Sequence, residues 1–133
     1  MKKIFSAEDH NLDNVLDFVR YKLEENEANI KLIMTIPLAI EEIFVNVAHY
    51  AYKGAKGDFE IDLAFKDDTV VITIEDSGVE FNPLAKEDPD IHLSAEDRKI
   101  GGLGIFMVKK IMDSVEYKRE NDKNILTLTK KIK

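Results

Sequence analysis

The sequence contains no cysteine, which excludes disulfide bonds, thiolate chemistry and cysteine-based zinc sites. No apolar stretch approaches the roughly 18 residues that a membrane-spanning helix needs. The opening segment, MKKIFSAEDH, lacks the apolar core of a signal peptide. There is also no internal repeat and no low-complexity linker. These absences predict a soluble, cytoplasmic protein with no membrane partner.

Positive charge is in short supply, since 19 Lys and Arg stand against 26 Asp and Glu, a formal net charge of −7. That balance argues against nucleic acid as a partner, because binding its phosphates requires clustered cations. The 133 residues, 44% of them hydrophobic, suffice for a single domain over 1–133 with a genuine core. Only the end of the chain is locally basic, and terminal lysines are typical of a solvated edge strand. The basic residues there are Lys118, Arg119, Lys123, Lys130, Lys131 and Lys133.

The first half of the chain is predicted to be mainly helical. A short strand is expected at KKIFSA, and apolar residues at helical spacing predict an amphipathic helix over about 11–26. The next segment, from Asn29 to Gly54, is helical and strongly apolar. Pro37 either opens a helix there or kinks one that began near Asn29, and the sequence does not decide between them. Gly54 is a plausible helix stop.

The second half changes to a period of two. Residues 59–66 alternate apolar and charged side chains, Asp67 and Asp68 make a turn, and 70–74 form a more buried strand. A long irregular stretch over about 77–100 follows, then a helix and a terminal hairpin with its turn near 121–124. This order predicts an α+β fold, a two-layer sandwich with helices on one face of a mixed, mostly antiparallel sheet.

A row of polar residues interrupts the apolar helical segment. Glu42, Asn46 and His49 are spaced by four and three residues, which places them on one face of a helix. The Asn oxygen suits Mg²⁺, which keeps most of its waters and shares phosphate oxygens. Glu42 could accept a proton from an attacking hydroxyl or orient a water, while His49 or Lys53 could meet a phosphate. The alternative is a helix edge that simply reaches solvent.

Two further clusters could contribute to the same site. Asp76 ends a predicted buried strand and Gly78 follows it. The Asp76 carboxylate either caps a local turn or accepts a hydrogen bond from a ligand amino group such as that of adenine, with Gly78 allowing close approach of the base. Gly101, Gly102 and Gly104 open an apolar helix, where backbone N–H groups and the helix dipole favour an anion. The alternative there is a flexible helix cap, and neither a Rossmann nor a Walker A pattern is present.

Taken together, these segments resemble the GHKL ATPase superfamily, and within it most of all the bacterial anti-sigma factor serine/threonine kinases. PLAIEEIFVNVAHYAY is similar to their N box, DSGVEFNP to the G1 box and RKIGGLGIFMVKKIMD to the G2 box with the end of the ATP lid. The resemblance covers roughly residues 30–133. A histidine kinase fits less well, because no dimerisation helix with a phosphoacceptor His precedes the N box.

The resemblance implies a Bergerat-type ATP-binding fold, with ATP and Mg²⁺ as cofactors and a role for each matching residue. Asn46 would ligate Mg²⁺ and Glu42 would be the catalytic base. Asp76 would bind the adenine amino group, with Gly78 beneath the base. Phosphate contacts would come from the glycine-rich segment under a lid over about 82–100, that is, from Gly101, Gly102, Leu103 and Gly104. Arg98 would contact the γ-phosphate or a partner protein, and His49 would contact a phosphate. Thr127 would support the adenine pocket.

The resemblance also implies a function and partners. The chain would be an ATP-dependent kinase that acts as an anti-sigma factor and phosphorylates a small anti-sigma factor antagonist protein. A second hypothesis is a nucleotide-gated protein that sequesters a sigma factor without kinase activity, and a third is a degenerate fold that no longer binds nucleotide. Apolar surface on the first helix or a sheet edge would suit a homodimer. Two positions depart from the family pattern, Tyr50 where many members have His, and Glu80 where a second G1 glycine is usual.

Overall fold

The structure, a computed structural model, describes residues 1–85 and 102–133. Its elements follow the predicted order of strand, two helices, two strands, helix and two strands. Two short 3₁₀ helices and one π-helical turn accompany them. In chain order they are β1 (Lys2–Ser6), η1 (Asp9–Asn11), α1 (Leu12–Glu25), α2 (Ile30–Asn46), the π-helical turn η2 (Val47–Ala51), β2 (Asp58–Lys66), β3 (Thr69–Asp76), η3 (Pro83–Ala85), α3 (Gly102–Ile111), β4 (Ser114–Glu120) and β5 (Lys123–Lys131).

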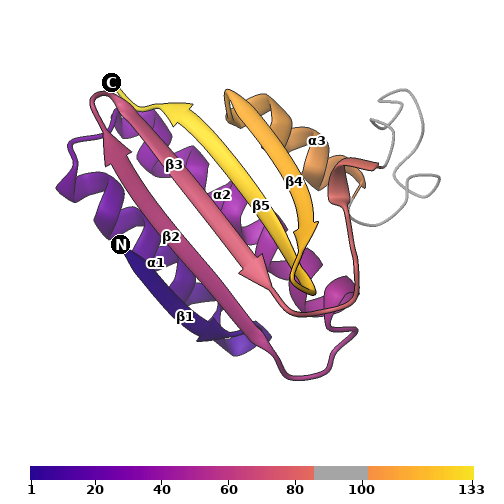
Figure 1. The fold of residues 1–133 in the computed structure, drawn as a ribbon. Helices are drawn as coiled ribbons and strands as arrows, with labels where there is room; N and C mark the ends of the chain where they lie inside the picture. Colours follow the sequence, from indigo (N-terminus) through magenta and orange to yellow (C-terminus); the bar gives the residue numbers. More distant parts are fainter. Residues whose placement is uncertain (86–101) are drawn as a thin grey trace.

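The strands form one sheet in the order β1-β2-β3-β5-β4, and every neighbouring pair is antiparallel. Figure 1 shows the three helices lying together behind one face of this sheet. The predicted two-layer α+β architecture is therefore confirmed, with a sheet that is antiparallel throughout the described residues rather than mixed. One consequence is that the end of β3 lies beside the start of β5, where Asp76 pairs with Asn124.

The core lies between the sheet and the helices. Alternate residues of β2 and β3 are fully buried, including Phe59, Ile61 and Ile72. They meet buried residues of α1 and α2 such as Phe44, whose ring packs edge-on against Phe59 with 5.0 Å between centroids. Each large apolar side chain buried in this way contributes about 1.5–3 kcal/mol. This packing holds α2 rigidly across the sheet.

Helix α2 begins before Pro37, which answers the question that the sequence left open. The helix starts at Ile30, and the Asn29 side chain caps it by accepting a hydrogen bond of 2.9 Å from the Lys31 amide. Pro37 lies inside the helix, where it cannot donate to the carbonyl one turn before it. Gly54, with φ of +82°, ends the segment as predicted.

The basic end of the chain does not form a single edge strand. Asn121 and Asp122 adopt φ of 54° and 61° and make the predicted hairpin turn. Strand β4, with Lys118, is an edge, but β5 returns between β4 and β3. The expectation of an edge strand was wrong for β5, because its alternate residues, such as Leu128, are buried against the helices. Burial of that apolar face outweighs the charge of its terminal lysines.

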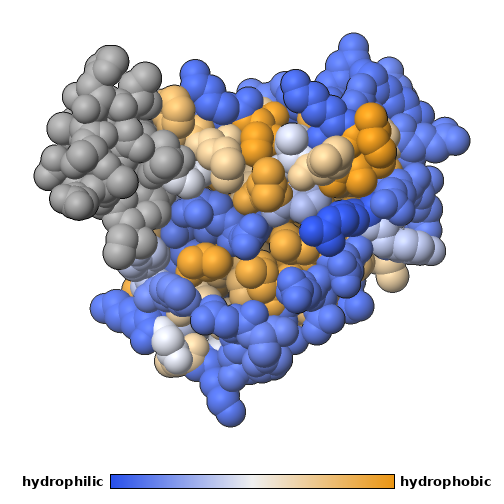
Figure 2. Space-filling model, turned by 180° about the vertical axis from the view of Figure 1, so that it is seen from behind, coloured by the Kyte–Doolittle hydropathy of each residue, from blue (hydrophilic) through white to orange (hydrophobic). Residues whose placement is uncertain are grey.

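The helix side of the molecule carries exposed apolar side chains, visible in orange in Figure 2. On α2, Ile30, Met34 and Leu38 are exposed and lie four residues apart, so they share one face of the helix. Within residues 1–85 and 102–133, no helix combines the length and apolar content required to cross a bilayer.

Candidate functional site

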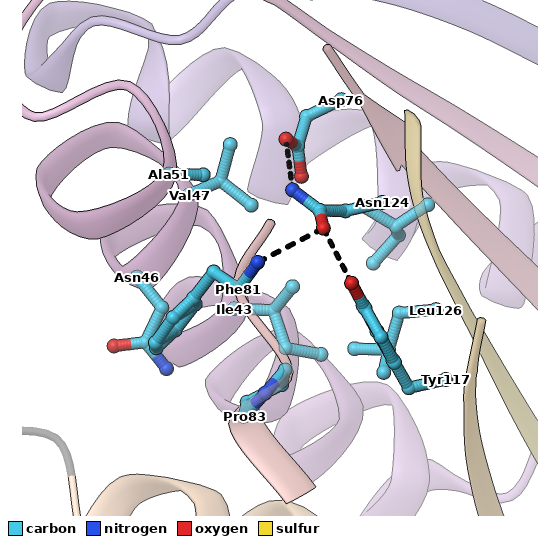
Figure 3. Close-up of a pocket in the computed structure, with 11 residues that line it drawn as sticks. Ile43, Asn46, Val47, Ala51, Asp76, Phe81, Pro83, Tyr117, Asn124 and Leu126 are labelled. Carbon is cyan, nitrogen blue, oxygen red and sulfur yellow. Dashed lines mark hydrogen bonds between the residues drawn. The ribbon is translucent and has the colours of Figure 1, made fainter. Parts of the chain in front are cut away.

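A partly open cavity lies between the end of α2, the end of β3 and the start of β5, with about 370 Å³ of empty space including the solvent at its mouth (Figure 3). Its lining is mainly apolar, with a few polar groups that converge from different elements. That combination is typical of a site that recognises a flat organic group. The cavity is formed by Ile43, Asn46, Val47, Ala51, Ile74, Asp76, Phe81, Pro83, Tyr117, Asn124 and Leu126.

Asp76 is the acidic group of this cavity and is only 5% exposed. Its Oδ1 accepts hydrogen bonds from the Asn124 side-chain amide at 2.8 Å and from the Gly78 backbone N–H at 2.9 Å. Burial raises the pKa of Asp76, although these hydrogen bonds and the charge of Arg119 oppose the rise. The part of the chain that the structure describes provides no donor for Oδ2. The carboxylate therefore caps a local turn with one oxygen, and its other oxygen has no donor within the described residues.

Asn46 is the second buried polar group of the cavity. It is 6% exposed, and its side-chain amide has no hydrogen-bond partner among residues 1–85 and 102–133. Leaving a buried amide unsatisfied costs about 1–3 kcal/mol. The same described residues contain no cluster of His, Asp or Glu that could enclose a metal ion. A single amide oxygen fits Mg²⁺, which is usually held by few protein groups together with waters and phosphate oxygens.

Glu42 lies one turn before Asn46 and contacts the first turn of α3. A Cβ atom added to Gly104 would collide with the Glu42 carboxyl group, so this glycine is what allows the two helices to bring the carboxylate so close. The N-terminus of a helix carries positive partial charge, which favours a carboxylate there. The structure thus joins the predicted N-box and glycine-rich clusters, although they are some 60 residues apart in the sequence.

We expect Gly104→Ala to displace the Glu42 side chain without unfolding the protein. The added methyl group meets the far end of a flexible side chain, which can rotate away, and Ala is favoured over Gly in a helix by about 1 kcal/mol. Thermal unfolding should therefore show unchanged or slightly increased stability, whereas phosphoryl transfer should fall at least about tenfold if Glu42 acts in it.

A double-mutant cycle with Glu42→Gln identifies the cause of that loss. If Gly104→Ala acts through Glu42, it should reduce transfer little further in the Glu42→Gln background. Equal losses in both backgrounds would contradict this explanation and would assign the effect to the α3 backbone.

His49 does not lie in the cavity. It is exposed, with its Nε2 3.2 Å from Asp9 Oδ1. The predicted row assumed α-helical spacing, but η2 is π-helical, as the bond of 3.0 Å from the Tyr52 amide to the Val47 carbonyl shows. This wider turn takes His49 out of line with Asn46.

Tyr50 and Gly78 have structural roles beside the cavity. The Tyr50 ring stacks on Phe81 with 5.5 Å between centroids, so the position that departs from the family pattern borders the cavity wall. A side chain at Gly78 would collide with the Ala51 backbone, and the Val79 N–H donates to the Ala51 carbonyl at 2.8 Å. Gly78 therefore lets the loop after β3 pack on the end of η2.

Thr127 is not brought to the cavity. It pairs with Thr73 on β3 and Glu116 on β4, and its neighbours Leu126 and Leu128 are the residues that β5 buries. Strand alternation therefore directs Thr127 to the opposite face of the sheet. The polar residue that β5 contributes to the cavity is one that the sequence analysis read only as part of a turn, Asn124.

Three further residues around Asn124 were also missed. The Tyr117 hydroxyl donates to Asn124 at 2.6 Å, and the Phe81 N–H donates to it at 3.0 Å. Arg119 donates to the Gly78 carbonyl at 2.9 Å. The available signal was the period of two through Leu126 and Leu128, which places Asn124 on the buried face of β5.

The remaining expectations concern the segment before α3. Arg98, Gly101 and most of the proposed lid, 86–100, lie outside the described residues. Gly102 and Leu103 form the start of α3, as the predicted helix entrance required. The backbone of this first turn lies beside Glu42, through the contact at Gly104.

Comparison with known proteins identifies the family to which the chain belongs. The sequence matches the profile of the histidine kinase-like ATPase domain over residues 5–130, so the chain belongs to this family. It is similar to the serine-protein kinase RsbW of Bacillus cereus strain AH187, with 30% identity over 98 residues, 71% of this chain and 61% of that protein. With RsbW of Listeria monocytogenes serovar 1/2a the identity is 27% over 89 residues, 63% of this chain and 57% of that protein.

Those figures mean that the chain spans about three fifths of the length of the curated relatives it matches. A solved structure of the RsbU and RsbW domains of a Mycobacterium tuberculosis protein superposes with a TM-score of 0.67. The match covers 99% of this chain and 32% of that one, at 19% identity. At that identity the match supports the fold, which is the one predicted.

Proposed function

We propose that residues 1–133 form a single ATP-binding domain that transfers the γ-phosphoryl group of ATP to a serine or threonine of a small protein. The observation that carries this proposal is the convergence on one cavity of two buried groups, Asp76 Oδ2 and the Asn46 amide, that have no hydrogen-bond partner among residues 1–85 and 102–133. Glu42 lies one turn from Asn46, against α3. The similarity to proteins named serine-protein kinase supports the same reaction.

Each group has a distinct task in this reaction. Asp76 accepts a hydrogen bond from the adenine amino group, and the backbone N–H groups of the first turn of α3 bind phosphate oxygens. Asn46 would hold Mg²⁺, which neutralises phosphate charge when bound. The substrate hydroxyl oxygen bonds to the γ-phosphorus while the bond from that phosphorus to the β,γ-bridging oxygen breaks. ADP leaves, and Glu42 accepts the hydroxyl proton.

The partners proposed are an anti-sigma factor antagonist as the phosphorylated protein and a sigma factor as the sequestered one, in the cytoplasm. Homodimer formation is part of the same proposal. The second candidate is a nucleotide-gated protein that binds a sigma factor and transfers no phosphate. The position of Glu42 favours the kinase, because a protein that only binds nucleotide has no need of a base beside the phosphate-binding helix.

Calorimetric titration of the purified chain with ATP tests this proposal, with Mg²⁺ and with EDTA in its place. We expect saturable binding that is at least about tenfold tighter with Mg²⁺, because the ion joins Asn46 to the phosphates. The absence of binding at millimolar ATP would overturn both candidates and would leave a regulatory scaffold that works without nucleotide.

A further inference from the structure

Asn124 is a buried side chain that uses all of its hydrogen-bonding capacity. An Asn amide offers two N–H donors and one oxygen with two lone pairs. The Asn124 Nδ2 donates to Asp76 Oδ1 and to the Val79 carbonyl, both at 2.8 Å. Its Oδ1 accepts from the Phe81 N–H at 3.0 Å and from the Tyr117 hydroxyl at 2.6 Å. Asn124 is 5% exposed, so these four partners define its environment.

The chemistry of the partners determines the orientation of the amide. Asp76 and the Val79 carbonyl can only accept at these positions, and the Phe81 N–H can only donate, so the reversed amide would face three mismatched groups. No donor or acceptor of Asn124 remains for a ligand. Although Asn124 lines the cavity, it can therefore influence a bound ligand only through its partners.

Those partners are the base-recognition carboxylate and one wall of the cavity. Through Asp76 Oδ1, Asn124 leaves Oδ2 as the oxygen available to a ligand. Through Val79 and Phe81, it fastens the loop after β3 to the same point. Phe81 in turn lines the cavity and stacks on Tyr50. Figure 3 shows the hydrogen bonds of Asn124 with Asp76, Phe81 and Tyr117.

We infer that Asn124 is a positioning residue for base recognition, which sets the Asp76 carboxylate to accept the amino group of an adenine nucleotide and ties the 79–81 loop to that carboxylate. This inference rests on the proposed nucleotide site. It makes amino-group selectivity a property of the Asp76–Asn124 pair, so that a change at Asn124 alters discrimination between nucleotides and not affinity alone.

Asn124→Asp gives this inference a distinctive signature in pH. The substitution places a second carboxyl group 2.8 Å from Asp76 Oδ1, and two buried carboxyls at that distance cannot both ionise without a large cost. At pH 8 we expect ATP affinity to fall about 100-fold, because repulsion moves the Asp76 carboxylate. As the pH falls to 6, one shared proton restores a donor between the two oxygens, and affinity should recover at least about tenfold relative to the wild type.

The other groups near the pair do not imitate this effect. Arg119 and Tyr117 face it from β4, Glu80 from the loop and Tyr52 from the residue after η2. Burial raises the pKa of both tyrosines above the ordinary value of 10.0, so neither titrates between pH 6 and 8. Glu80 and the phosphates of ATP are common to the wild type and the variant, so the wild-type profile serves as the baseline.

Two companion proteins complete the experiment. Asn121→Asp makes the same charge change at an exposed residue of the same hairpin and should bind ATP like the wild type at every pH. Asn124→Ala has no second carboxyl group, so it should bind ATP more weakly, with the same pH dependence of affinity as the wild type. If Asn124→Asp does not fold at pH 8, Asn124→Ala still tests the inference.

Inosine triphosphate, which carries an oxygen in place of the adenine amino group, measures selectivity by the same calorimetry. The preference of the wild type for ATP should shrink at least about tenfold in Asn124→Ala, since its carboxylate is no longer held in place. Unchanged selectivity together with a pH profile parallel to that of the wild type would overturn the inference while leaving the proposed function intact. Absence of ATP binding by the wild type would overturn both.

Discussion

Replacing Asp76 with asparagine is expected to weaken ATP binding at least about 100-fold. The oxygen of the introduced amide can keep the two bonds that Oδ1 now accepts, from Asn124 and Gly78. The NH₂ group of that amide then replaces Oδ2 and points a donor at the donor of the adenine amino group. The loss combines a charged hydrogen bond, worth about 1.5–3 kcal/mol, with a buried mismatch.

The same substitution should leave the fold as stable as before, or more stable. Burial raises the pKa of Asp76 in the folded state. The folded protein therefore binds this proton more tightly than the unfolded chain, and the contribution of Asp76 to the free energy of unfolding falls as the pH rises from the ordinary pKa of 3.8 through the raised one. Because a neutral amide removes that penalty at pH 7, the thermal unfolding temperature should be unchanged or higher.

Calorimetry with ATP and with inosine triphosphate, alongside thermal unfolding, checks both parts. Asp62→Asn is the matched control, since Asp62 pairs with the exposed N-terminal amine, and such surface pairs contribute about 0–1 kcal/mol. A folded Asp76→Asn protein that still prefers ATP over inosine triphosphate would show that the base is recognised elsewhere.

Glu42→Gln is expected to reduce phosphoryl transfer by about 10²- to 10⁴-fold, the usual contribution of a general base. The amide has nearly the same shape as the carboxylate and should still fit against Gly104. ATP affinity should therefore remain within about threefold of the wild type, since the interaction lost belongs to the transition state. The measurement is transfer of radiolabelled phosphate from ATP to a purified antagonist protein, beside calorimetric titration with ATP.

Glu41→Gln provides the control for Glu42, because it removes the same charge from the adjacent, also partly exposed residue of α2. It should transfer phosphate like the wild type. If Glu42→Gln retains full transfer, the base lies elsewhere. If the wild type binds ATP and captures a sigma factor but phosphorylates no antagonist, the nucleotide-gated binding protein is the better account.

Much of the fold could be predicted from the sequence, because its signals are local. The period of two around Phe59 and Ile61 and the helical spacing over 11–26 depend on neighbouring residues alone. Gly54 could be predicted as a helix stop because glycine readily adopts a positive φ, as it does here. The order of these elements allows few arrangements in which helices cover a sheet, so the two-layer architecture could also be predicted.

The candidate site was predictable only in part. Asp76 and Asn46 could be identified because each is a polar residue within a buried element, where burial without a partner is costly. His49 was included on the assumption of α-helical spacing, which the π-helical turn η2 does not follow. Thr127 was predicted to support the adenine pocket because it lies on a late strand. Its place on the face of β5 opposite the buried residues keeps it away from the cavity.

The sequence by itself determined the secondary structure, the α+β class and the groups able to meet a nucleotide, since these follow from side-chain chemistry and short-range periodicity. Tertiary structure alone decided which of those groups meet. Asn124 reaches Asp76 across 48 residues, and Glu42 meets Gly104 only because α2 and α3 pack side by side. The physical reason is that hydrogen-bond geometry and close packing depend on distances between segments, and no local pattern of residues carries that information.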